Sequence, residues 1–337
     1  MLNKLAYGFS LIGLPFLVPI FKLIGGVDPK DQIKLIWKTL GIPLVSIVIF
    51  LALWSGAAKE VKTSLGQVPG PSVVWKGFVG LVEDHNRERE KEVRFYERLK
   101  KRNAKQLAED PNAEIVHRKY TGKYTYFDQI GVSLYTVFAG FLLASFIAIP
   151  LGILTGLNEN FMIAMNPIIQ IFKPVSPLAW LPIVTMVVSA LYTTQDGWFE
   201  KSFLNSAITV TLCSLWPTLI NTALGVASID KDLINVSRVL QLDWKTHVFK
   251  IVLPSSLPLI FTGLRLSLGV GWMVLIAAEM LAQNPGLGKF VWDEFQNGSS
   301  QSLARIMVAV LTIGIIGAML DRLMSALQEI FTFGDQR

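Results

Sequence analysis

Residues 228–254 read SIDKDLINVSRVLQLDWKTHVFKIVLP, a polar stretch with a helical pattern that ends at a proline. Long apolar segments flank it on both sides: SFLNSAITVTLCSLWPTLINTALGVA at 202–227 and SSLPLIFTGLRLSLGVGWMVLIAAEML at 255–281. Segments of this length and apolarity are candidate membrane-spanning helices. A helical loop between two such segments is open to contact from the aqueous phase. The pattern therefore predicts a membrane subunit that meets a soluble partner.

The composition of the whole chain agrees with a membrane protein. Of its 337 residues, 52% are hydrophobic, and the mean hydropathy is +0.47. About 20 apolar residues in a helix cross roughly 30 Å of hydrocarbon, and backbone groups in lipid must be satisfied within the segment. We therefore predict an all-α polytopic membrane protein with about six transmembrane helices, at residues 39–57, 132–156, 175–192, 202–227, 256–281 and 303–325.

Charge, cysteine and histidine usage argue against several other classes. The net charge is +6, but the basic residues lie in loops between apolar segments, where they usually set orientation, so we expect no nucleic-acid partner. The single cysteine, Cys213, allows no intrachain disulfide, and the three histidines have no metal-ligand spacing. Residues 286–290 (GLGKF) lack the spacing and the hydroxyl residue of a phosphate-binding loop. We expect no metal and no cofactor in this chain.

The chain divides into five regions. Residues 1–38 are expected to form an N-terminal interfacial or amphipathic segment. Within it, residues 5–21 are a short apolar stretch with two prolines, which lies in the membrane interface, re-enters the membrane or spans it. Asp28 and Pro29 predict a helix start, and Lys30, Lys34 and Lys38 place a basic stripe on one face. The remaining regions are the first transmembrane helix (39–57), a polar and largely helical insertion (58–128), a core with the loop 228–254 (129–330) and a short tail (331–337).

Six spans place both termini on the same side of the membrane as the 228–254 loop. That loop carries Lys231, Arg238, Lys245 and Lys250, which favours the cytoplasmic side. The insertion at 58–128 then lies on the opposite, periplasmic side. It holds more basic than acidic residues, but long loops translocate largely regardless of charge.

The insertion contains a charged helix predicted at about 83–110. Three acid-before-base pairs, Glu83–Arg87, Glu90–Arg94 and Glu97–Lys101, are spaced to stabilise an exposed helix. Its apolar stripe is thin. A solvated helix or hairpin explains the pattern, and a docking surface for a partner is the alternative.

Within the polar loop, Leu233, Val236 and Leu240 form one apolar helix face. Asp230 is a candidate cap for the start of this helix, and Pro254 is expected to end the second helical stretch. A short helix with one apolar face either docks into a partner's groove or packs on its own spans.

The loop resembles the cytoplasmic coupling loop of bacterial ABC importer permeases. The family pattern is Glu-Ala-Ala, three residues, Gly, and about a dozen residues later Ile-x-Leu-Pro. This sequence has Asn235-Val236-Ser237, then Gln241, and later residues 251–254 (IVLP). The spacing and the final proline match, whereas Asn235 and Gln241 replace the Glu and the Gly.

Further motifs resemble the branch of that family that imports nitrate, nitrite, bicarbonate or cyanate and is related to sulfonate and taurine permeases. They are FKPVSPLAWLP at 172–182, FTGLR at 261–265, AAEML at 277–281, GKFVWDE at 288–294 and LDRL at 320–323. The resemblance covers about residues 130–330. It implies a type I importer core, in the inner (plasma) membrane of a bacterium.

The resemblance also implies a division of labour. ABC ATPase subunits, which hold ATP and Mg, bind the loop; a periplasmic solute-binding protein delivers the substrate; a second permease copy completes the path, and lipid surrounds it. The substrate would be nitrate or nitrite, with bicarbonate, cyanate, sulfonate or taurine as alternatives. The residues expected to couple to the ATPase are Asp232, Leu233, Asn235, Val236, Arg238, Leu240, Gln241 and Pro254.

Charges and prolines within the spans suggest a translocation path. Charges in hydrocarbon are costly and are usually functional or paired. Arg265 is a candidate for attracting an oxyanion, and Glu279 for shaping an outer gate, although either could instead pair with a neighbouring helix. Lys173 faces an anion or snorkels to the interface, and Pro177, with Pro182, is expected to kink the third span. Asp321 and Arg322 are expected to pair with other helices. Glycines expected to permit close helix packing are Gly152, Gly156, Gly263, Gly269 and Gly271.

Two other classes are compatible with an apolar chain. A stand-alone channel or secondary transporter would need selectivity or coupling groups within one chain, and inverted repeats are not evident. A membrane enzyme would need clustered histidines, cysteines or carboxylates, which the sequence does not show. We therefore expect a transport subunit and not an enzyme.

Overall fold

The computed structural model describes residues 17–25, 28–63, 66–110, 115–192 and 199–333. Residues 1–16, which include most of the segment 5–21, the connection at 193–198 and the end of the tail lie outside the described residues. The helices are α2 (Leu17–Ile24), α3 (Pro29–Ile36), α4 (Ile42–Glu60), α5 (Pro71–Glu109), α6 (Tyr126–Leu157), α7 (Glu159–Phe172), α8 (Pro177–Leu191), α9 (Lys201–Ala227), α10 (Lys231–Val239), α11 (Trp244–His247), α12 (Leu253–Ala282), α13 (Leu287–Asn297) and α14 (Ser300–Phe333). Two π-helical turns, η1 (Trp37–Gly41) and η2 (Val248–Val252), join helices, and β1 (Lys62–Thr63) pairs antiparallel with β2 (Gly66–Gln67).

Five of the described helical stretches are long and apolar enough to cross a membrane, and a bent pair of helices makes a sixth. This confirms an all-α membrane protein with about six spans. The first stretch runs without interruption from Pro29 to Glu60, through α3, η1 and α4. The basic helix expected on the membrane surface and the first span are therefore one continuous helix of 32 residues.

Both π-helical turns precede a proline. The turn at Trp37–Gly41 comes before Pro43, and the turn at Val248–Val252 comes before Pro254. A proline has no N–H and its ring clashes with the preceding turn, and a widened turn relieves that clash. The helix from Trp244 therefore continues to Ala282. The prediction that Pro254 ends a helix is wrong, because the π turn accommodates it.

The third span is a pair of helices and not the single helix predicted at 175–192. α7 and α8 meet at an angle of 101° across a break at residues 173–176. The Ser176 hydroxyl accepts a hydrogen bond from the Leu178 N–H at 3.3 Å, and Pro177 is the first residue of α8. Non-helical backbone at membrane depth is stable only where protein or water satisfies it. The break is therefore more than the kink that Pro177 and Pro182 predict.

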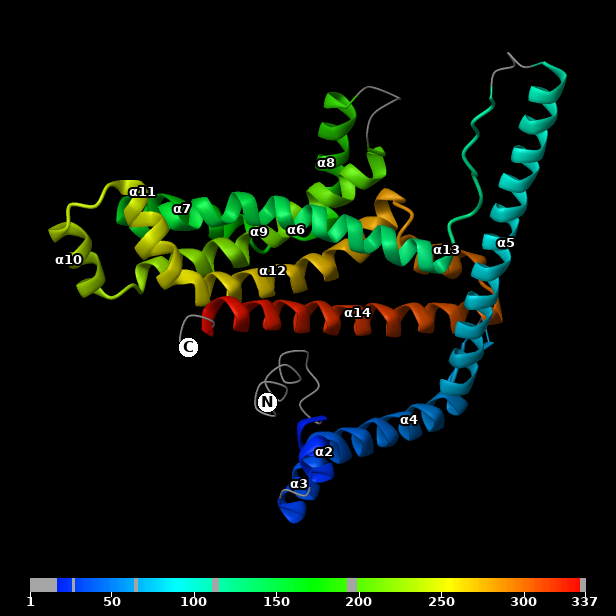
Figure 1. The fold of residues 1–337 in the computed structure, drawn as a ribbon, viewed down its shortest axis with the longest axis horizontal. Helices are drawn as coiled ribbons and strands as arrows, with labels where there is room; N and C mark the ends of the chain where they lie inside the picture. The colour runs from blue at the N-terminus through cyan, green and yellow to red at the C-terminus, as the bar shows by residue number, and fades with distance from the viewer. Residues whose placement is uncertain (1–16, 26–27, 64–65, 111–114, 193–198, 334–337) are drawn as a thin grey trace.

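α9 lies at the centre of the bundle, packed between α6 and α12 (Figure 1). Glycines on α6 allow the close approach: a Cβ on Gly152 would come within 2.6 Å of the Thr222 Cβ, and one on Gly156 within 2.6 Å of the Val226 Cβ. Gly263 of α12 likewise packs on α9. A Cβ added to Gly269 would have nothing within 4 Å, so this glycine does not form a close helix contact within the described chain. Small residues at this contact let two backbones approach.

Several polar side chains of α9 form hydrogen bonds inside the bundle. The Thr211 hydroxyl donates to the Gly140 carbonyl of α6 at 3.1 Å. The Thr218 and Ser267 hydroxyls lie 2.7 Å apart, and Ser267 also donates to the Ser214 carbonyl. Hydrogen bonds of this kind hold transmembrane helices together. α9 is thus fixed to both neighbours by contacts that lipid cannot replace.

The two ends of the bundle carry different elements. α10 and α11 lie at one end, while α5 crosses the other end next to α13 (Figure 1). The last turns of α14 lie at the α10–α11 end. The polar loop and the insertion are therefore on opposite sides of the spans, as the parity of the spans predicts. We call the end of the bundle that carries α5 the outer end.

Adding a methyl group at Gly152 tests the packing of α6 on α9. We expect Gly152→Ala to lower the free energy of unfolding by about 1–3 kcal/mol, because the methyl overpacks against Thr222 and the Leu219 carbonyl. The measurement is thermal unfolding of the purified protein in detergent. Gly131→Ala, in the same helix but facing open space, is the control and should not destabilise. Equal melting temperatures for the two variants would contradict the packing described.

Candidate functional site: a coupling surface, an intramembrane ion pair and an outer polar junction

The α10–α11 hairpin is built by local capping. The Asp230 carboxylate accepts a hydrogen bond from the Asp232 N–H at 2.9 Å and caps α10, as predicted. Asp243 caps α11 through the N–H and the hydroxyl of Thr246, and these hydrogen bonds hold the pKa of Asp243 below its usual value. The Ser237 hydroxyl and His247 Nδ1 lie 2.7 Å apart and tie the two helices together.

The apolar face of α10 is open to solvent. Leu233, Val236 and Leu240 are 46%, 52% and 62% exposed. The sequence left two alternatives for this face: docking into a partner's groove, or packing on the spans of this chain. These three side chains do not pack on the spans. Trp244 and Phe249, which follow in α11 and η2, are also exposed. Among the other predicted coupling residues, Asp232, Asn235, Arg238 and Gln241 are also exposed.

Gln241 adopts the backbone conformation that favours glycine. Its φ is 49°, and the Leu242 N–H donates to the Ser237 carbonyl at 3.1 Å to close the end of α10. Helices commonly end on such a left-handed residue, and glycine holds that position with the least strain. The Gly of the family pattern therefore has a structural role, which Gln241 fills here at a conformational cost of about 1 kcal/mol.

Arg265 is paired and does not stand alone. Its Nε and Nη2 lie 2.5 and 2.7 Å from the two carboxylate oxygens of Asp321, which joins α12 to α14. Both side chains remain about half exposed, at 44% and 47%. This confirms the expectation that Asp321 pairs with another helix. Lys173 lies at the break between α7 and α8, and Pro177 begins α8.

Glu279 is fully buried where α6, α12 and α13 meet. The Ser133 hydroxyl lies 2.8 and 2.9 Å from its carboxylate oxygens, and the Gly288 N–H donates to it at 3.0 Å. Ser133 also accepts the Leu287 N–H at 2.8 Å. A side chain on Gly286 or Gly288 would collide with Glu279. Gly286 and Gly288 thus make room for the carboxylate.

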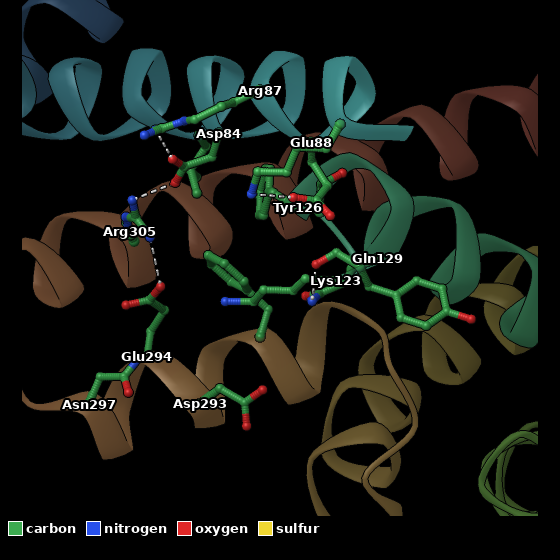
Figure 2. A pocket seen from close by; sticks show the side chains of 15 residues that line it. Asp84, Arg87, Glu88, Lys123, Tyr126, Gln129, Asp293, Glu294, Asn297 and Arg305 are labelled. Carbon is green, nitrogen blue, oxygen red and sulfur yellow. Dashed lines mark hydrogen bonds and ion pairs between the residues drawn. The ribbon is translucent and has the colours of Figure 1, made fainter. Parts of the chain in front are cut away.

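A polar pocket of about 320 Å³ lies at the outer junction of α5, α6, α13 and α14 (Figure 2). Arg305 of α14 bridges it, with Nη2 2.7 Å from Asp84 of α5 and Nη1 3.3 Å from Glu294 of α13. The sequence does not predict these contacts, because Asp84 and Arg305 lie 221 positions apart. Within α5, the four-residue spacing predicted an ion pair between Arg87 and Glu83. The structure pairs Arg87 with Asp84 instead, at 2.5 Å.

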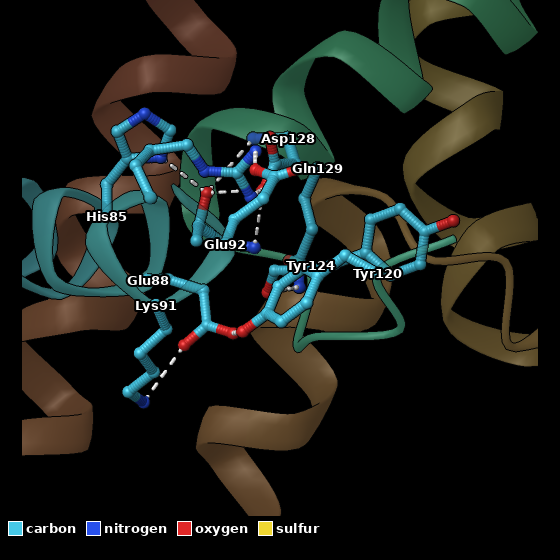
Figure 3. Close-up of polar contacts among 10 residues, drawn as sticks. His85, Glu88, Lys91, Glu92, Tyr120, Tyr124, Asp128 and Gln129 are labelled. Carbon is cyan, nitrogen blue, oxygen red and sulfur yellow. Dashed lines mark hydrogen bonds and ion pairs between the residues drawn. The ribbon is translucent and has the colours of Figure 1, made fainter. Parts of the chain in front are cut away.

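A second group of contacts fastens the segment before α6 onto α5 (Figure 3). His85 Nδ1 lies 2.7 Å from the Thr125 hydroxyl, and Arg89 Nη2 donates a hydrogen bond to the Asp128 carboxylate at 3.1 Å. The Tyr120 hydroxyl donates to Glu88 at 2.8 Å, which lowers the pKa of Glu88 and raises the pKa of Tyr120. α5 is therefore joined to α6 and α14 by several polar contacts at the outer end.

Residues 148–332 match the family of binding-protein-dependent transport system inner membrane components. The chain belongs to this family. Two curated relatives are a nitrate import permease protein of Synechococcus elongatus, 36% identical over 58% of this chain and 67% of its own length, and a bicarbonate transport system permease protein of Synechocystis sp., 37% identical over 63% of this chain and 74% of its own length. A solved methionine ABC transporter in an inward-facing conformation shares the fold, with 15% identity, a TM-score of 0.53 and coverage of 61% of this chain and 96% of that chain.

Family membership confirms the resemblance stated from the coupling loop and the core motifs. The chain is a multi-pass inner-membrane permease subunit of an ABC importer and not an enzyme, and ATP hydrolysis belongs to a separate chain. Such a permease works with an ATPase and a substrate-binding partner. The family match begins at residue 148, so α5 and most of α6 lie outside it, whereas Glu294 and Arg305 of the outer junction lie within it.

A charge on the exposed face of α10 tests its role as a contact surface. We expect Leu233→Asp to reduce copurification of the ATPase subunit about tenfold, since an uncompensated carboxylate in an apolar interface is costly. The measurement is the ATPase-to-permease ratio after purification of the tagged permease. Asn160→Asp, in the first turn of α7, adds the same charge at the same end of the bundle and should leave the ratio unchanged.

Removal of the Glu279 carboxylate tests the buried junction. Glu279→Ala should lower the free energy of unfolding by about 1–3 kcal/mol, because the Ser133 hydroxyl and the Gly288 N–H lose their acceptor. Glu279→Gln keeps one acceptor oxygen and should cost less. Thermal unfolding in detergent gives the ranking, with the exposed Glu200→Ala as control. If Glu279→Ala melted at the wild-type temperature, the junction would not have the role assigned to it.

Proposed function

We propose that this permease forms the membrane path of an ATP-driven importer for a small planar oxyanion, nitrate or nitrite first and bicarbonate second. The relatives support this, because similar proteins from cyanobacteria are named as nitrate and as bicarbonate permeases at almost the same identity. Cyanate, sulfonate or taurine would extend the same proposal to other anions.

The observation that carries the proposal is the half-exposed Arg265–Asp321 pair within the spans. Ionic groups in a membrane face protein or water, because exposure to hydrocarbon is costly. We infer that this face of α12 and α14 borders the water-filled path. Arg265 uses Nε and Nη2 for Asp321, and a guanidinium has further N–H groups that can bind an oxyanion.

The path requires partners. We propose that two copies of this chain form a dimer around it, that each copy presents its α10 face to one ATPase subunit, and that ATP and Mg bind on those ATPases. Glu279 and Lys173 would then act at the margins of the path: Glu279 by fixing the outer ends of α6 and α12, and Lys173 by placing a cation at the break before Pro177. The coupling set from Asp232 to Gln241, with Pro254, would transmit ATP-driven motion into α12.

Uptake in cells tests the proposal. Cells with and without this gene receive labelled nitrate or labelled bicarbonate, before and after ATP depletion. We expect gene-dependent uptake of one of the two anions that stops when ATP is depleted. Gene-dependent uptake that survives ATP depletion would overturn the proposal in favour of a channel or secondary transporter. Uptake of neither anion would refute the proposed substrates and direct the search to cyanate and sulfonates.

Neutralising Arg265 tests its place on the path. Arg265→Gln should reduce anion uptake about tenfold while the ATPase still copurifies, because one charge-assisted contact is worth roughly 1.4 kcal/mol or more. Arg265→Lys keeps the charge and should retain part of the activity. Arg322→Gln removes an exposed cation next to Asp321 and is the matched control, with wild-type uptake expected. A fully active Arg265→Gln transporter would reject the assignment.

A further inference from the structure

The insertion helix α5 reaches beyond the bundle. It crosses the outer ends of α14 and α6, and its C-terminal half extends past them (Figure 1). Polar contacts anchor its middle: Asp84 to Arg305 of α14, and Arg89 to Asp128 of α6. α5 is thus a helix of 39 residues fixed at the outer surface with a projecting end.

The projecting end carries most of the excess charge of the chain. Between residues 93 and 123 the sequence has nine Lys and Arg and four Asp and Glu, a net charge of +5, and the whole chain has +6. A strong local charge of one sign on a surface steers partners of the opposite sign. Six of the nine cations, from Arg94 to Lys105, lie on α5 directly beyond the Asp84 and Arg89 anchors.

Four of these cations share one helix face. Arg94, Arg98, Lys101 and Lys105 follow one another at intervals of four, three and four residues, and all are exposed. We call these four residues the basic face. The opposite side of α5 is covered by the returning chain: the Tyr96 hydroxyl accepts the Tyr120 N–H at 3.2 Å, and the Asn103 side chain donates to the Val116 carbonyl at 3.0 Å. The returning segment lies on the side of α5 toward the spans (Figure 1).

The charges of the basic face are largely uncompensated. Arg94 pairs with Glu90 at 3.2 Å and Lys105 approaches Glu109 at 3.9 Å, but these side chains are 63–80% exposed and such surface pairs contribute little. Arg98 and Lys101 make no ion pair with any acidic residue that the structure describes. The pair predicted between Glu97 and Lys101 is not among the ion pairs formed.

The direction of the basic face selects the kind of partner. It points away from the spans, so the headgroups of the surrounding membrane are on the other side of the helix. It also lies at the end of the bundle opposite α10 and α11, away from the surface that meets the ATPase (Figure 1). The remaining partner is a water-soluble molecule on the outer side, large enough to contact four cations along about 16 Å of helix.

We propose that the basic face of α5 docks an acidic face of the soluble substrate-binding protein that serves this importer. The inference rests on the proposed function for the identity of the transporter, and on the predicted periplasmic side of the insertion for the outer position of α5. Charge complementarity would speed the encounter and orient the binding protein over the spans. The contacts of Asp84 and Arg89 would hold the docked helix in a fixed position relative to α14 and α6.

Charge reversal tests the docking. The complete transporter, permease with its ATPase, is placed in nanodiscs, and the probe is the purified binding protein encoded with it. Arg98→Glu/Lys101→Glu should weaken binding by about tenfold or more at low salt. Raising the salt from about 50 to about 300 mM should weaken wild-type binding and have little effect on the variant, because salt screens exposed charges.

A matched control carries the same change in charge elsewhere on the hairpin. Lys100→Glu/Lys119→Glu reverses two exposed cations off the basic face and should alter binding by less than about twofold. Arg98→Lys/Lys101→Arg keeps the charge and should bind as the wild type does. Equal binding by the wild type and Arg98→Glu/Lys101→Glu, or equal losses in the two reversal variants, would overturn the proposal.

Crosslinking identifies what touches the basic face. Lys101→Cys introduces an accessible thiol, and the one native cysteine, Cys213, is buried. A photo-crosslinker on residue 101 should capture the binding protein in intact cells, and the same reagent at Lys100→Cys should capture less. Capture of phospholipid or of a second permease copy in place of the binding protein would refute the assignment.

The outcome is separable from that of the proposed function. Charge-dependent binding by a transporter that takes up neither nitrate nor bicarbonate would refute the proposed substrates and support the docking surface. ATP-dependent uptake of either anion by a transporter whose binding protein ignores the basic face would support the proposed function and refute the docking surface.

Discussion

The close packing of α9 between α6 and α12 is the contact on which the rest of the molecule depends. It combines glycines that let the backbones approach with hydroxyl groups that bond across the helices, such as Thr218 to Ser267. Lipid offers no hydrophobic force between helices, so shape and hydrogen bonds must hold them. α9 ends directly before the α10–α11 hairpin and α12 begins directly after it, so this packing sets where the coupling surface stands. α6 begins beside α5, so the same packing also positions the outer junction.

The structure explains one departure from the family pattern. The residue after α10 must adopt a left-handed conformation, which accounts for a glycine at that position, and Gln241 adopts it with a φ of 49°. The exposed apolar side chains of α10 do not depend on this change. Asn235, in place of the family's Glu, lies on the exposed surface of the same helix, where a partner would contact it. The surface that we propose to meet the ATPase is therefore retained in its apolar part and altered in its polar part.

Features that arise from local pattern could be predicted from the sequence. Long apolar runs predicted the spans, the period of Leu233, Val236 and Leu240 predicted the face of α10, and Asp230 predicted its cap. Prediction failed where a distant contact or an unusual turn decides. The π turn before Pro254 lets a helix continue through a residue that usually ends one, and the predicted span at 175–192 is joined through a bend of 101° to the helix before it. The pairing of Arg305 with Asp84 joins residues 221 positions apart, and no periodicity reports such a contact.

We assign opposite ends of one bundle to two soluble partners, the ATPase at α10 and the binding protein at α5. The most direct test uses proteoliposomes containing the permease and its ATPase, with ATP and binding protein supplied on chosen sides. We predict that labelled anion moves only when ATP is on the side of the α10 face and loaded binding protein is on the side of α5. Movement of anion with both on the same side, or without ATP, would contradict this assignment.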